Sequence, residues 1–139
     1  MARTTFSGPV VSQNGFISGA QVTAANAVNA TGTASAAQVA SGYITSTSAL
    51  ATTITLPTGT LLGAALNATQ GTTMELIVDN TAGANAVTIA VATNGILSTA
   101  AVDSATSFGD LTIAAGATGI GRFTIMFSSP TAYVFTRTA

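Results

Sequence analysis

The sequence predicts an all-β protein: an antiparallel β-sandwich, jelly-roll-like, with an extended N-terminal arm. Apolar and polar residues alternate with a period of two in several short runs, which is the pattern of half-buried strands. Turn residues separate about eight such runs, as in folds of two packed sheets. A chain of 139 residues can also bury roughly two-thirds of its unfolded surface, so a single core is feasible.

The clearest strand signal lies in residues 72–92, TTMELIVDNTAGANAVTIAVA. Apolar residues take alternate positions in 74–78 and again in 87–91. The intervening NTAGAN, residues 80–85, is rich in residues that favour chain reversal. We therefore expect an antiparallel hairpin here, with its apolar face at the centre of the core.

We expect residues 1–19, MARTTFSGPVVSQNGFISG, to form an extended N-terminal arm or an edge hairpin. The alternative is a first strand of the domain's own sheet. The Asn14-Gly15 step is a strong turn signal, and proline at position 9 excludes a central strand there. The two phenylalanines of this segment need burial, either on the same domain or on a neighbour. The candidate anchors are Phe6, Pro9, Val10 and Phe16.

Residues 20–42 are a low-complexity connection, almost free of large side chains. A short helix over 34–39 is weakened by the surrounding Thr, Asn, Ser and Gly, so we expect a loop or an extended connection.

Residues 43–139 form the β-sandwich domain. Strands are expected over 43–47, 52–56, 111–113, 122–128 and 132–137, with a helical turn or loop over 61–68 and a long connection over 95–108. In the 122–128 run, Phe123, Ile125 and Phe127 share one face, which is the second clear core face.

Charge is the most informative part of the composition. Only 5% of residues are charged, and the chain holds no Lys and no His. With a net charge of −1 there is no basic patch for nucleic acid, and no apolar run approaches the roughly 20 residues of a membrane span. A neutral, hydroxyl-rich surface has little self-repulsion, so we expect copies of the protein to associate.

The titratable residues argue against catalysis. Without imidazole, thiol or amine side chains, Ser-His-Asp and Cys-His arrangements are excluded. Glu75 and Asp79 would lie roughly 13 Å apart on one strand face, whereas a glycosidase pair needs about 5 to 9.5 Å. The glycines of GATGIG, residues 116–121, lead into a strand and are expected to be turn residues. We expect no enzyme activity, no cofactor and no metal.

The few charged residues are better suited to fixing how sheets or copies of the protein align than to catalysis. Ion pairs can fix how sheets or copies align, and the interface candidates are therefore Glu75, Asp79, Arg122 and Arg137.

The segments TTFSGPVVSQNGF, TTITLPTG, MELIVDNTAG, AVTIAVATNG and LTIAAGATG resemble small virion proteins of tailed bacteriophages, notably phages of marine bacteria. The closest likeness is to head decoration, or cement, proteins. This resemblance implies a β-rich homotrimer on the capsid exterior that bridges major capsid proteins, with no active-site residues. Fibre and knob proteins share similar strand-turn patterns. The alternative is therefore a host-recognition module, in which Tyr43, Tyr133 or residues 95–108 contact a surface glycan.

Overall fold

The computed structural model describes residues 26–97 and 111–138, which fold mainly as β-structure. The N-terminal arm over residues 1–19 and most of the 95–108 connection lie outside these residues. The described elements are β1 (Gly32–Thr33), α1 (Ala36–Ala40), β2 (Tyr43–Thr45), β3 (Thr52–Thr55), α2 (Gly59–Leu66), β4 (Thr73–Asp79), β5 (Val87–Ala90), β6 (Gly95–Leu97), β7 (Thr112–Ile113), β8 (Ile120–Ser129) and β9 (Ala132–Arg137).

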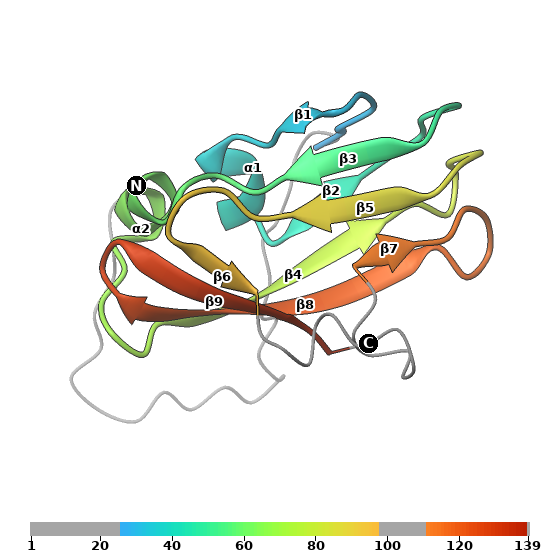
Figure 1. Cartoon of the computed structure of the whole chain (residues 1–139). Coiled ribbons are helices and arrows are strands. Elements are labelled where there is room, and N and C mark those ends of the chain that lie inside the picture. The colour runs from blue at the N-terminus through green and yellow to red at the C-terminus, as the bar shows by residue number, and fades with distance from the viewer. Residues whose placement is uncertain (1–25, 98–110, 139) are drawn as a thin grey trace, which may run out of the picture.

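The strands form two sheets, and the chain changes sheet at each step from β1 to β8. One sheet has the order β1-β3-β5-β7 and the other β2-β4-β8-β9-β6 (Figure 1). Among the described strands, only the step from β8 to β9 stays within a sheet. The expected hairpin over 72–92 is therefore wrong: β4 and β5 are the strands expected there, but they belong to different sheets.

This alternation also explains the strand directions. Because two changes of sheet bring the chain back beside the earlier strand, β1 and β3, β3 and β5, and β2 and β4 pair in parallel. The β6–β9 pair is parallel too, whereas β4–β8, β5–β7 and β8–β9 are antiparallel. The sheets are thus mixed, and the expectation of an entirely antiparallel fold is wrong.

The inward faces of the two sheets share one core. The five-stranded sheet contributes the large aromatic side chains, in which Phe123 stacks on Phe135 with ring centroids 4.9 Å apart and Phe127 tilts against Tyr133 at 5.9 Å. The four-stranded sheet contributes aliphatic side chains, Ile54, Val87, Ile89 and Ile113. The alternation predicted for the 74–78, 87–91 and 122–128 runs correctly assigned the buried face of each strand.

Both helices begin at a side-chain cap. The α1 helix contradicts the loop expected over 34–39, because Ser35 and Gln38 form a reciprocal capping box that satisfies two backbone N–H groups. In α2 the Thr58 hydroxyl accepts from the Leu61 N–H, and the helix ends at Asn67 in the left-handed conformation. The helical alternative for 61–68 is therefore confirmed over most of that range.

Asn80 joins the end of β4 to two other turns. Its backbone N–H donates to Gly119 O at 2.6 Å, and its side-chain amide donates to Asn85 O at 2.9 Å and Ala114 O at 3.0 Å. A Cβ at position 119 would overlap the Asn80 carbonyl, so glycine permits this close approach. The expectation that the 116–121 glycines are turn residues before a strand is confirmed for Gly116 and Gly119, whereas Gly121 lies buried within β8.

The α2 helix rests on the turn between β8 and β9 through small residues. A Cβ at Gly63 would overlap the carbonyl oxygen of Pro130, and one at Gly59 would overlap that of Thr131. Nearby, the buried Tyr133 hydroxyl donates to Pro57 O at 3.0 Å. Glycine therefore sets the distance between α2 and this turn.

We predict that Gly63→Ala destabilises the protein by about 2 kcal/mol or more, because the added methyl group meets a backbone carbonyl. Helix propensity alone predicts the opposite sign, a gain of about 1 kcal/mol. Urea unfolding followed by circular dichroism measures the difference. The exposed Ala64→Gly in the same helix is the control and should cost about 1 kcal/mol. A Gly63→Ala variant as stable as the parent would contradict the close packing.

Candidate interaction surface

The outward side of the five-stranded sheet, here called the five-stranded face, is a broad surface made of alternate strand residues. Pairing places Tyr43, Ile77 and Arg122 in one row across β2, β4 and β8. A second row runs from Thr73 through Met126 and Val134 to Ile96, across β4, β8, β9 and β6. The rest of the five-stranded face comprises Thr45, Glu75, Asp79, Ile120, Thr124, Ser128 and Thr136.

Large apolar side chains are concentrated on this face. Ile96 is 55% exposed, Ile120 is 49% exposed and Met126 is 45% exposed, and only two other large hydrophobic residues in the described part of the chain are comparably exposed. Met126 and Ile96 lie in one row at the Thr73 end of the face, and Ile120 lies at its Asp79 end. A row of exposed apolar residues is typical of a surface that contacts another protein. Ile96, at the start of the region expected to be a long connection, is therefore a residue of this face and not of the core.

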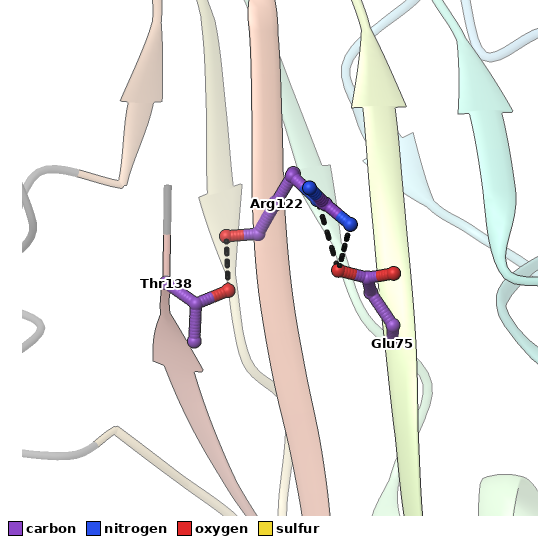
Figure 2. A network of polar contacts seen from close by, with 3 residues as sticks. All are labelled: Glu75, Arg122 and Thr138. Atoms are coloured by element: carbon purple, nitrogen blue, oxygen red, sulfur yellow. Dashed lines mark hydrogen bonds and ion pairs between the residues drawn. The ribbon is translucent and has the colours of Figure 1, made fainter.

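Glu75 and Arg122 form an ion pair across β4 and β8, on the five-stranded face (Figure 2). The Arg122 Nε and Nη2 atoms both lie 2.9 Å from Glu75 Oε1. The hydrogen bond to Glu75, together with its charge, raises the pKa of Arg122. The ion pair thus joins two of the four charged interface candidates, Glu75 and Arg122.

Asp79, at the other end of β4, takes neutral partners. Its Oδ1 accepts from the Thr81 hydroxyl at 2.6 Å and from the Thr81 N–H at 2.9 Å, and its Oδ2 accepts from the Tyr43 hydroxyl at 2.8 Å. The two bonds from Thr81 lower the pKa of Asp79. Burial opposes them, and the hydrogen bond from Tyr43 adds a lowering that is smaller than the effect of burial. The same contact with Asp79 raises the pKa of Tyr43.

Arg137 lies on the inward alternation of β9 and links the two sheets. Its Nη1 donates to the carbonyl oxygen of Thr112, in β7 of the four-stranded sheet, at 3.0 Å. Its guanidinium carbon lies 5.9 Å from the centre of the Phe123 ring. Of the four charged interface candidates, Arg137 is thus the one that aligns sheets within the molecule.

The outward side of the four-stranded sheet, here called the threonine face, has a different chemistry. Thr53, Thr88 and Thr112 lie opposite one another across β3, β5 and β7, and the hydroxyls of Thr88 and Thr112 are 3.3 Å apart. Thr55 pairs with Ala90 on the same side. Every charged residue in the described part of the chain belongs to the five-stranded sheet, so the threonine face is neutral.

Tyr133 is fully buried. This burial raises the pKa of its hydroxyl to about 12. Tyr133 cannot contact a glycan as the host-recognition alternative expects. Tyr133 and Phe135 fall on one alternating face of β9, so the burial of Tyr133 was detectable in the sequence. The candidate anchors Phe6, Pro9, Val10 and Phe16 lie outside the described residues.

Within residues 26–97 and 111–138 there is no group of three or more acidic, histidine or cysteine side chains that could hold a metal. None of the described helices is long and apolar enough to cross a membrane. Comparison with known proteins found no matching family model, no matching curated protein and no matching solved structure.

We predict that Arg137→Met destabilises the protein by about 1 to 3 kcal/mol, because the Thr112 carbonyl loses a charged donor and the Phe123 ring loses its cation. Arg122→Met removes an ion pair that solvent already screens, so it should leave the urea midpoint nearly unchanged. Urea unfolding of both variants measures the contrast. Equal effects of the two substitutions would contradict the inter-sheet role of Arg137.

We predict that the Asp79 carboxyl titrates below the ordinary value of about 3.9 and that Thr81→Val raises its pKa. Because the pKa is lowered in the folded state, Asp79 contributes stability above its unfolded pKa, and this contribution is lost as the pH falls through the folded value. Carbon-detected NMR titration of the carboxyl group measures both values. Thr45→Val is the control, since Thr45 lies opposite Asp79 but donates no hydroxyl bond to it. An unchanged pKa in Thr81→Val would disprove the assignment.

Proposed function

We propose that this protein is a structural virion protein, a decoration or cement protein that binds the major capsid protein lattice on the capsid exterior. The observation that carries the proposal is the five-stranded face, where Ile96, Ile120 and Met126 are about half exposed beside a neutralised ion pair. The resemblance of the sequence to phage head decoration proteins agrees with this reading.

A cement protein needs one surface for its own copies and another for the lattice. The two broad faces described above differ in this way, because one carries large apolar side chains and the charges among its threonines and the other is built mainly of threonines. We assign the first to contacts between copies, most simply in a homotrimer, because large apolar side chains suit a permanent interface. Many identical weak contacts, repeated by symmetry, then hold the shell without catalysis.

The N-terminal arm, with Phe6, Pro9, Val10 and Phe16 as anchors, belongs to this proposal as the segment that reaches a neighbour or the shell. The jelly-roll connectivity expected from the sequence is not required by it. The host-recognition alternative loses one of its two tyrosines, because Tyr133 is buried, and retains Tyr43 on the five-stranded face.

We predict that purified particles of the virus that encodes this chain contain it in hundreds of copies, in a simple ratio to the major capsid protein. Quantitative mass spectrometry of the particles measures this ratio. A few copies per particle, located at the tail, would support a fibre or knob module and contradict the cement role.

A second readout concerns salt. Since the surface carries so few charges, binding of the recombinant protein to particles stripped of it should change little between about 0.05 M and 1 M NaCl. Pelleting of particles with bound protein measures this, and loss of binding at the higher salt concentration would show that ionic contacts dominate.

A further inference from the structure

The apolar row on the five-stranded face needs a partner. Met126, Val134 and Ile96 lie side by side across β8, β9 and β6, and the first and last of these are about half exposed. The row lies at the Thr73 end of the sheet, because Thr73 pairs with Met126. It is flanked on β4 by Glu75, whose Oε2 has no hydrogen bond to any described residue.

The N-terminal segment has the matching composition. Residues 1–25 carry one charge, at Arg3, and the large apolar residues Phe6, Val10, Val11, Phe16 and Ile17. The five-stranded face carries two acids, Glu75 and Asp79, and one base, Arg122, so its net charge is −1 against +1 for the segment. The two are therefore complementary in hydrophobicity, whereas the charges beside the row cancel in the Glu75–Arg122 pair and Asp79 lies at the Ile120 end of the face.

The segment joins the described chain at the edge of the five-stranded sheet. The Asn26 carbonyl accepts from the Thr45 N–H at 3.1 Å, and the Asn26 side chain donates to Tyr43 O at 2.9 Å. Ala27 bridges Thr45 in parallel, so Asn26 lies on the side of this bridge toward the start of β2. Pairing of β2 with β4 and of β4 with β8 shows that this is the end of the sheet where Met126 lies.

We propose that the N-terminal segment of a neighbouring copy packs over the Met126–Val134–Ile96 row. This rests on the proposed function, in which the protein is a homo-oligomer. An extended segment of 25 residues spans about 80 Å, whereas a five-stranded sheet is only about 20 Å wide. The segment is therefore long enough to reach a neighbouring copy, and exchange of such segments around a ring closes a cyclic oligomer.

Cross-linking tests the contact directly, because the chain has no cysteine. The full-length variants Ser18→Cys, beside Phe16, and Ser128→Cys, on the same face of β8 as Met126, are mixed before assembly and treated with a short bismaleimide. We expect a covalent pair containing one chain of each variant, identified by a mass tag on one of them. Thr53→Cys, on the threonine face, replaces Ser128→Cys in the control and should give no such pair.

Two results would overturn the proposal. A link formed only within one chain of the Ser18→Cys, Ser128→Cys double variant would show that the segment covers its own sheet, and no link in any mixture would show that it lies elsewhere. As a second measurement, Met126→Glu should shift the protein to smaller species in sedimentation velocity, whereas Thr53→Glu should not. Full shell binding by an oligomer that gives no cross-link would reject this contact and retain the proposed function. A monomer that does not bind the shell would contradict both this contact and the proposed function.

Discussion

The burial of two apolar strand faces against each other is the constraint on which the rest of this structure depends. Because the chain changes sheet from strand to strand, each inward residue meets one from the opposite sheet, as Ile113 of β7 meets Gly121 of β8. The aromatic side chains of β8 and β9 fill the space that the smaller aliphatic residues of β3, β5 and β7 leave. Outward positions do not pack in this core, which allows one face to carry exposed apolar and charged side chains and the other to consist mainly of threonines.

Local patterns predicted the elements but not their partners. A period of two identifies a strand and its buried face, so the inward sets of β4, β5 and β8 were correct. It does not say which strand lies alongside, and the turn residues at 80–85 suit a crossing between sheets as well as a hairpin. The α1 helix was overlooked because propensity outweighed a local signal, the Ser35–Gln38 capping box.

The alternation of strand residues also explains why the charged interface candidates have different partners. Glu75 and Arg122 both alternate outward, so their pairing could be anticipated once β4 and β8 were neighbours. Arg137 alternates inward with Phe135, which places its guanidinium at the margin of the core, within reach of the Thr112 carbonyl of the other sheet and of the Phe123 ring. The partners of Asp79 depend on the conformation of the turn that follows β4 and on the register of β2 against β4. Neither can be predicted from the spacing of residues in the sequence alone.

The alternation between sheets also affects how the chain acquires its structure. Apart from the β8–β9 hairpin, the described strand pairs join segments that are distant along the chain; Glu75 and Arg122, for example, are 47 residues apart. Such a high contact order slows folding, because long loops must close before their contacts contribute. During synthesis β4 gains its neighbour β8 only after β5, β6 and β7 have emerged, so the nascent chain exposes unpaired strands and depends on late completion of the central pair.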